Sequence, residues 1–132
     1  MPPIFHMISL APKPVAPFSH AVEIDGWIFV TGQMPTDAND DDALLPLGIQ
    51  AQTHRVMENL ILVLRGVRLS LEYVVSARAY LTNFKQDYAA MNAVYASYFP
   101  LDKRPARTCI GVTALARDAL VEIDLVARRM GA

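Results

Sequence analysis

Apolar and polar residues alternate near the C-terminal end of the chain. From residue 121 to residue 128 every second position is apolar, with Val121, Ile123, Leu125 and Ala127 on one side. Strict alternation is typical of a β-strand that buries one face. We therefore expect a strand here, with these four side chains turned toward a core.

A second, shorter strand is predicted just before this one, and the two are expected to form an antiparallel hairpin with its turn near residues 115–116. This register places Cys109 opposite Glu122. Arg107 then lies opposite Asp124, so that a guanidinium, a thiol and two carboxylates share one face. Such a face meets water, another subunit or a small polar ligand.

The rest of the chain carries strand and helix patterns in turn. Asp25 and Gly26 separate two alternating segments, which is a strong signal for a type I′ hairpin turn. Apolar positions three and four residues apart predict two amphipathic helices, and Pro100 ends the second. The expected elements are strands over 21–25 and 27–31, a helix over 49–65, a strand over 73–81, a helix over 87–99 and strands over 107–112 and 121–128, with or without a further strand over 4–8.

Two amphipathic helices can cover only one face of such a sheet. We therefore predict an α+β fold in which residues 1–132 form a single domain, with a mixed sheet and both helices packed on the same face. The uncovered face carries Arg107, Cys109, Glu122 and Asp124 in this prediction. A monomer would leave that mixed face in water, so a second copy of the chain is expected to cover it.

Composition narrows the class of protein. The chain has 132 residues, 53% of them hydrophobic and 19% charged, which is typical of a compact globular protein. Its net charge of -1 argues against binding to nucleic acid or to an anionic membrane. No apolar run has the length of a membrane span, no signal peptide is visible, and the one cysteine fits a reducing cytoplasm.

No metal or cofactor motif stands out. The histidines His6, His20 and His54 lack the spacing of zinc ligands. The acidic segment over 37–48 begins like a calcium loop, but Asp42 stands at its sixth position, where such loops need glycine. There is also no Gly-rich phosphate loop, so we expect neither a metal nor a cofactor.

Short motifs along the chain resemble, in order, those of one known family. The motifs are Ala16-Pro17-Phe18-Ser19-His20-Ala21-Val22, Val30-Thr31-Gly32-Gln33-Met34-Pro35, Gln52-Thr53 with Asn59-Leu60, Ala79-Tyr80-Leu81-Thr82, Met91-Asn92-Ala93-Val94-Tyr95, Pro105-Ala106-Arg107-Thr108-Cys109 and Val121-Glu122-Ile123. Each motif alone is weak, but their common order is specific. The chain resembles the RidA/YjgF family of small trimeric enamine/imine deaminases, formerly grouped as endoribonuclease L-PSP proteins.

The resemblance implies a YjgF/chorismate-mutase-like fold, a homotrimer with sites at the subunit boundaries, and an imino acid substrate. The implied reaction is hydrolysis of reactive 2-enamine and 2-imine intermediates, such as 2-aminoacrylate, to 2-keto acids and ammonia without a cofactor. By the same resemblance, Arg107 binds the substrate carboxylate and Glu122 positions the hydrolytic water. The other pocket residues implied are Phe18, Thr31, Gly32, Asn92 and Cys109. Phe18 stands where the family has tyrosine, so one hydroxyl is missing from the implied pocket.

Other functions and plainer residue roles stay open on the residues alone. Arg107 would serve equally as an ion-pair partner of Asp124, Glu122 as a solvated strand residue and Cys109 as a small buried residue. Two other functions are a non-catalytic member that binds a small carboxylate, and a ribonuclease or translation inhibitor. The neutral charge and the absence of a basic, aromatic-rich stripe argue against the RNA-directed function.

Overall fold

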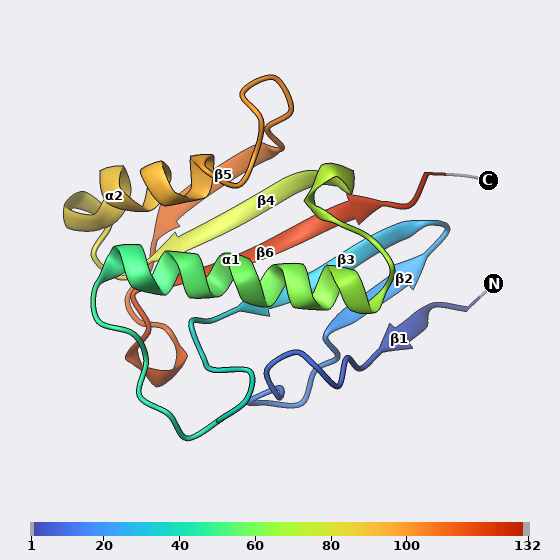
Figure 1. The fold of residues 1–132 in the computed structure, drawn as a ribbon, viewed down its shortest axis with the longest axis horizontal. Helices are drawn as coiled ribbons and strands as arrows, with labels where there is room; N and C mark the ends of the chain where they lie inside the picture. Colours follow the sequence, from blue (N-terminus) through green and yellow to red (C-terminus); the bar gives the residue numbers. More distant parts are fainter. Residues whose placement is uncertain (1, 131–132) are drawn as a thin grey trace.

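Six strands form the sheet of the computed structural model, which describes residues 2–130, and their order is β1-β2-β3-β6-β4-β5 (Figure 1). All neighbouring strands are antiparallel except β4 and β5, which run parallel. The elements are β1 (Ile4–His6), β2 (Ala21–Ile24), β3 (Trp27–Gln33), α1 (Ile49–Gly66), η1 (Leu71–Tyr73), β4 (Val74–Leu81), α2 (Phe84–Ala96), β5 (Ala106–Gly111), η2 (Ala116–Asp118) and β6 (Val121–Arg128).

The hairpin of β2 and β3 forms where the sequence predicts it. Ile24 pairs with Trp27, and the two residues between them, Asp25 and Gly26, have φ angles of 51° and 81°. Positive φ at both central positions is the type I′ geometry that suits the twist of a hairpin. The further strand at the N-terminus is also present, as β1, and it pairs with β2.

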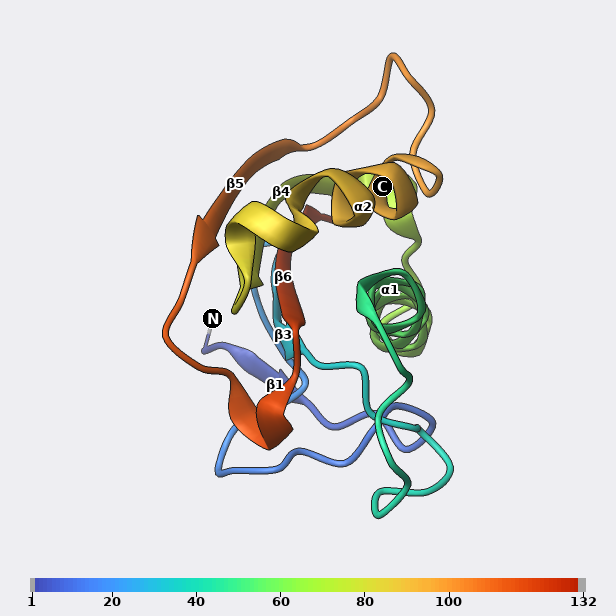
Figure 2. The same cartoon turned by 90° about the vertical axis from the view of Figure 1, so that its left-hand side faces the viewer.

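Both helices pack on the same face of the sheet, as predicted (Figure 2). The alternating residues of β6 form the centre of the core: Val121, Ile123, Leu125 and Ala127 are all at most 1% exposed. The helices complete this core with side chains three and four positions apart, including Val56, Leu60, Val63, Leu64 and Met91. No helix within residues 2–130 is long and apolar enough to cross a membrane.

The predicted hairpin of the last two strands is wrong. β6 lies between β3 and β4, and β5 pairs with β4 at the edge of the sheet. The cause is the crossover: β4, α2 and β5 form one βαβ unit, whose two strands must be parallel. The segment after β5 then passes through η2 and returns along the middle of the sheet as β6 (Figure 1).

This pairing also places the side chains of β5 on the other face from the one predicted. Arg107 and Cys109 are in register with Ala77 and Ala79, which are buried beneath the helices. Residues paired in register point to the same face of a sheet. Arg107 and Cys109 therefore lie on the helix side, and of the four residues predicted for the open face only Glu122 and Asp124 lie there.

Candidate active site

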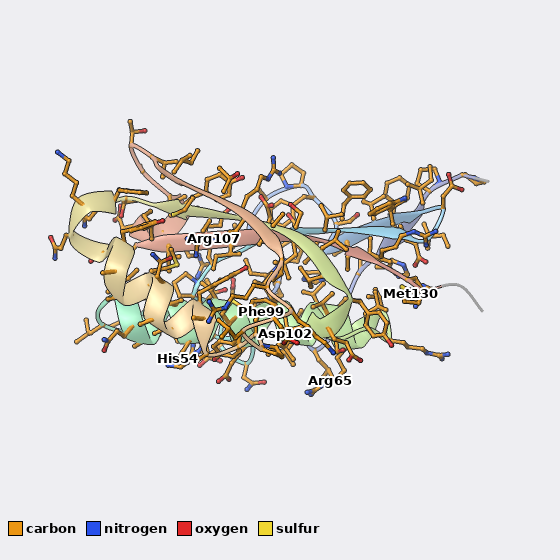
Figure 3. The ribbon with its side chains drawn as sticks, turned by 90° about the horizontal axis from the view of Figure 1, so that it is seen from above. His54, Arg65, Phe99, Asp102, Arg107 and Met130 are labelled. Carbon is orange, nitrogen blue, oxygen red and sulfur yellow. The ribbon has the colours of Figure 1, made fainter. Side chains whose placement is uncertain are left out.

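Two predicted site residues, Asn92 of α2 and Arg107 of β5, line a cavity of about 250 Å³. We call it the arginine pocket, and its polar side chains are Asn92, Tyr95, Arg104 and Arg107. Asn92 and Tyr95 come from α2, whereas the two arginines flank the start of β5. In Figure 3, Phe99 lies in the segment that leads from α2 to β5, and Arg107 lies farther along the chain, on β5 itself.

Arg107 is held by aromatic rings and has no acidic partner within residues 2–130. Its Cζ lies 4.9 Å from the centroid of the Tyr95 ring and 5.9 Å from that of Tyr88. The suggested ion pair with Asp124 is absent, because Asp124 pairs with Arg78 at 2.9 Å. Nη1 of Arg107 makes one long contact with Sδ of Met91, at 4.0 Å. Its other N–H donors have no partner in the described chain, so Arg107 is available to bind a carboxylate.

Two polar atoms of the arginine pocket are buried and have no hydrogen-bond partner within the described residues. They are Oδ1 of Asn92 and the hydroxyl of Tyr95. Burial raises the pKa of Tyr95, and the nearby charge of Arg107 opposes this shift. Unpaired buried polar atoms are costly and therefore uncommon. Here they lie beside an unpaired cation, where a polar ligand would satisfy them.

Cys109 lies two residues beyond Arg107 on the same side of β5 and packs against the core. Burial raises the pKa of its thiol, although the charge of Arg107 works in the opposite direction. A thiol with a raised pKa stays protonated at neutral pH and is a poor nucleophile. The geometry therefore gives Cys109 no activating group for covalent catalysis.

The remaining predicted site residues border a groove of about 400 Å³ on the other side of the molecule. Phe18, Thr31 and Gly32 line this groove, and the carboxyl group of Glu122 lies against Gly32. We use the name glutamate groove for this hollow together with the adjoining carboxyl group of Glu122. Phe18 is 39% exposed, so its ring is accessible from this hollow.

A β-bulge creates the contact between β3 and Glu122. Val30 pairs with Leu125, but Gln33 pairs with Ile123, so β3 has one residue more than β6 over this stretch. The bulge brings Gly32 against the side chain of Glu122. A Cβ atom at position 32 would collide with Oε2 of Glu122 and lie 2.9 Å from its Cδ. Glycine leaves this space to the carboxyl group, and any larger residue would displace the side chain of Glu122.

The surroundings of Glu122 favour its protonated form. Burial raises the pKa of Glu122, and the negative charge of Asp124 raises it further. Asp124 itself is fully engaged, because it accepts hydrogen bonds from Arg78 Nε and from the Tyr80 hydroxyl, each at 2.9 Å. Glu122 makes no hydrogen bond or ion pair within the described part of the chain. A carboxyl group in this condition is suited to general acid–base chemistry.

Two buried polar residues of α1 hold the strands around the glutamate groove, and sequence reasoning did not assign them a role. Asn59 donates hydrogen bonds to the carbonyl groups of Met34 and Thr36, at 2.9 and 2.8 Å, just after the bulge. Gln52 accepts a hydrogen bond from the N–H of Leu120, at 2.8 Å, just before β6. Polar residues on the buried face of a predicted helix were the signal for such a role.

His20 fixes the loop that carries Phe18. Its side chain is buried, with Nδ1 accepting a hydrogen bond from the N–H of Ile8 at 2.8 Å and Nε2 donating one to the carbonyl of Pro12 at 2.6 Å. This pairing defines a neutral imidazole with its proton on Nε2. His20 is thus a structural residue. Within residues 2–130 no group of three or more His, Cys, Asp or Glu side chains is placed to hold a metal ion.

A single chain does not bring the two groups of site residues together. The arginine pocket opens on the helix side of an edge strand, whereas the glutamate groove lies on the open face of inner strands. Arg107, Asn92 and Cys109 form one group, and Phe18, Thr31, Gly32 and Glu122 form the other.

Comparison with known proteins defines the family. Residues 8–129 match the family model described as Endoribonuclease L-PSP. The chain belongs to this family, whose members also carry the names RidA, YjgF and RutC. The 3-aminoacrylate deaminase RutC of Acinetobacter baylyi is 39% identical, over 88% of this chain and 90% of its own. Many other relatives are named only as RutC family proteins.

Solved structures share the fold. A putative endoribonuclease from Thermotoga maritima has a TM-score of 0.88 and 34% identity, with 97% of this chain and 100% of that chain covered. TdcF from E. coli, solved with bound serine, has a TM-score of 0.85 and 25% identity, with 96% and 98% covered. The mixed α+β architecture is therefore the fold of this family.

Proposed function

We propose that this protein hydrolyses 2-enamine and 2-imine intermediates to 2-keto acids and ammonia in a reducing cytoplasm. The observation that carries the proposal is the carboxyl group of Glu122, which is partly desolvated, has no partner within residues 2–130 and lies against Gly32. The relative named 3-aminoacrylate deaminase supports the same chemistry.

Glu122 would handle the protons of the reaction. An enamine first takes a proton on carbon and becomes an imine; water then adds to the C=N bond, and ammonia leaves from the resulting carbinolamine. Over the whole reaction, R–CH=C(NH₂)–COO⁻ and H₂O give R–CH₂–CO–COO⁻ and NH₃. The ionised carboxyl group takes a proton from the attacking water, and the protonated form returns it to the departing nitrogen. Because the pKa of Glu122 is raised, this carboxyl group holds its proton to a higher pH than an ordinary glutamate does, which suits a group that both takes and returns a proton.

Arg107 would hold the carboxylate of the substrate. Its guanidinium has no acidic partner in the described part of the chain, rests on the Tyr95 ring and lines a pocket that contains the unpaired carbonyl oxygen of Asn92. A guanidinium matches a carboxylate through two parallel hydrogen bonds, which orients the substrate as well as binding it. Orientation toward a positioned base and water is a large source of rate enhancement.

We also propose that two copies of the chain form each site, within a homotrimer. The residues needed to bind and to hydrolyse lie on opposite faces of one chain, so a neighbouring copy must supply one of the two groups. The open face also carries the aromatic residues Phe5, Trp27 and Phe29, which are 66%, 42% and 49% exposed. Such a patch favours an interface. The number three rests on the family resemblance.

Mixing two inactive variants tests the shared site directly. Arg107→Lys keeps the charge but loses the bidentate fork, and Glu122→Gln cannot take a proton, so each variant alone should lose most activity. In randomly mixed oligomers, about a quarter of shared sites would join an intact arginine to an intact glutamate. We expect about that fraction of wild-type activity after denaturation and joint refolding, and only the low residual activity of each variant when the two are refolded separately. No recovery in demonstrably mixed oligomers would contradict the shared site.

The activity itself is tested by a coupled assay. A serine or threonine dehydratase generates the enamine in solution, and keto-acid formation is followed with and without this protein. An acceleration that depends on protein concentration is expected, and it should disappear with Glu122→Gln. Light scattering coupled to size exclusion should give the mass of three chains. Unchanged keto-acid formation with a correctly assembled protein would contradict deamination.

A non-catalytic role in binding small carboxylates is the second candidate. Phe18 lacks the hydroxyl of the family tyrosine, and TdcF was solved with bound serine. A binder would saturate with serine or a keto acid and leave the rate of keto-acid formation unchanged. Measuring ligand binding and turnover on one preparation separates the two functions.

A further inference from the structure

We propose that this protein prefers 2-imino acids whose side chain ends in a second carboxylate, and that Arg104 binds that second carboxylate. The inference rests on the proposed function for its reaction, but it concerns the class of ligand. It arises from the arginine pocket, which is lined by two guanidinium groups and, among residues 2–130, by no acidic side chain.

The two arginines differ in depth. Arg107 is half-buried and rests on the ring of Tyr95, whereas Arg104 is exposed. Neither one has an ion-pair partner among residues 2–130, although Arg55, Arg78 and Arg129 all pair with acidic residues of the chain. Two unpaired cations that line one cavity repel each other until an anion lies between them. The inner cation suits the carboxylate next to the imine, and the outer cation suits a carboxylate at the end of a side chain.

The pocket is also built to hold a polar ligand at its inner end. Tyr95 is 5% exposed, and both its hydroxyl and Oδ1 of Asn92 are buried without partners in the described chain. These groups can donate to the inner carboxylate and accept from the imine nitrogen. The 250 Å³ of the cavity leaves room for a short acidic side chain toward Arg104. The two unpaired cations make an uncharged side chain the poorer match.

The test compares substrates and ligands that differ by one carboxylate. Amino-acid oxidases generate imines in solution from aspartate or glutamate and, for comparison, from leucine or methionine, and imine loss is followed by semicarbazide trapping. Binding of the unreactive ligands succinate and butyrate is measured by calorimetry on the same preparations. The variants are Arg104→Ala and the matched control Lys103→Ala, which removes a neighbouring exposed cation outside the pocket.

The wild-type protein should process the dicarboxylic imines faster and bind succinate more tightly than butyrate. Arg104→Ala should lower both ratios about fivefold, which is the upper scale of an exposed ion pair, and Lys103→Ala should leave them unchanged. Equal or absent binding of the two ligands by the wild type, or equal loss with both variants, would overturn the proposal. If no imine is hydrolysed but the succinate preference depends on Arg104, deamination fails while the ligand class stands.

Discussion

The arginine pocket and the glutamate groove prepare charged groups in opposite ways. In the arginine pocket, Arg107 rests on aromatic rings and stays charged without a partner in the described chain. In the glutamate groove, Glu122 is pressed between a bulged strand and an ionised neighbour, which favours its neutral form. The first arrangement suits a group that must hold a charge throughout a reaction, and the second suits a group that must gain and lose a proton.

The backbone of the arginine pocket also differs from that of the glutamate groove. β5 is a regular edge strand paired in continuous parallel register from Ser76 to Leu81 of β4. β3 is interrupted by its bulge where it meets Glu122. A regular strand is sufficient to place a long, flexible arginine. The short reach of a glutamate requires the backbone itself to come close, and bulges are over-represented next to active sites for such reasons.

The largest effect should come from removing the proton carrier. Glu122→Gln should keep carboxylate binding and lose about 10²- to 10⁴-fold in turnover, because an amide cannot accept the proton of water. Keto-acid formation gives the turnover, and calorimetric titration with a keto acid gives the binding. An equal loss of both would show that Glu122 does not differ from Arg107 in role.

A smaller loss should follow when the close approach in the glutamate groove is removed. In Gly32→Ala the new Cβ would meet the carboxyl group of Glu122, so the side chain must move. We expect a loss of roughly 10- to 100-fold in turnover, since small displacements of a catalytic group are costly. Thermal unfolding checks that the variant is folded.

A double variant shows whether Gly32 acts through Glu122. If it does, Gly32→Ala should cost little further activity in the Glu122→Gln background. Losses that multiply instead would assign Gly32 a role of its own, such as shaping the groove around the substrate.

Local structure could be read from the sequence, and strand pairing could not. The alternation in β6 and the Asp25-Gly26 turn each depend on a few adjacent residues, and both predictions were right. The predicted hairpin of β5 and β6 was wrong. The short connection between the two strands looks like a hairpin turn in the sequence, but the sequence does not show that other strands pair with each of them. The strand–helix–strand order of β4, α2 and β5 contained the correct pairing, since a crossover helix demands parallel strands.

The chemistry of the candidate site was easier to predict than its geometry. Arg107 and Glu122 stand out by residue type and by family resemblance. Their separation onto opposite faces follows from the pairing of β5 with β4, which no local pattern reveals. Asn59 and His20 were also missed as positioning residues, because their partners are backbone groups, whose positions no pattern of side chains reveals.

A modest change in substrate preference is expected from position 18, where the glutamate groove would contact a ligand that the arginine pocket of a neighbouring copy also binds. Phe18→Tyr adds one hydroxyl to the glutamate groove and should change the relative rates on small and bulky imines by up to about tenfold, the scale of one hydrogen bond. Phe18→Leu is the control, because it alters the ring without adding a hydroxyl. Identical ratios in all three proteins would mean that position 18 does not tune the pocket.

The smallest effect concerns stability and tests the tuning of Glu122 without any substrate. Burial and Asp124 raise the pKa of Glu122 in the folded chain above its ordinary value of 4.5. Between the two pKa values the folded state holds this proton more firmly than the unfolded chain does, so the free energy of unfolding falls as pH rises through that window. The glutamine side chain of the Glu122→Gln variant carries no titrating proton, so the variant does not lose this part of its free energy of unfolding as pH rises.

At equal protein concentration, Glu122→Gln should therefore unfold a few degrees above the wild type at neutral pH and at nearly the same temperature at about pH 4. Glu72→Gln, which alters an exposed carboxylate of η1, should show no such divergence. If Glu122→Gln follows the wild type at every pH, the carboxyl group is not tuned by its surroundings, and the contrast with Arg107 disappears.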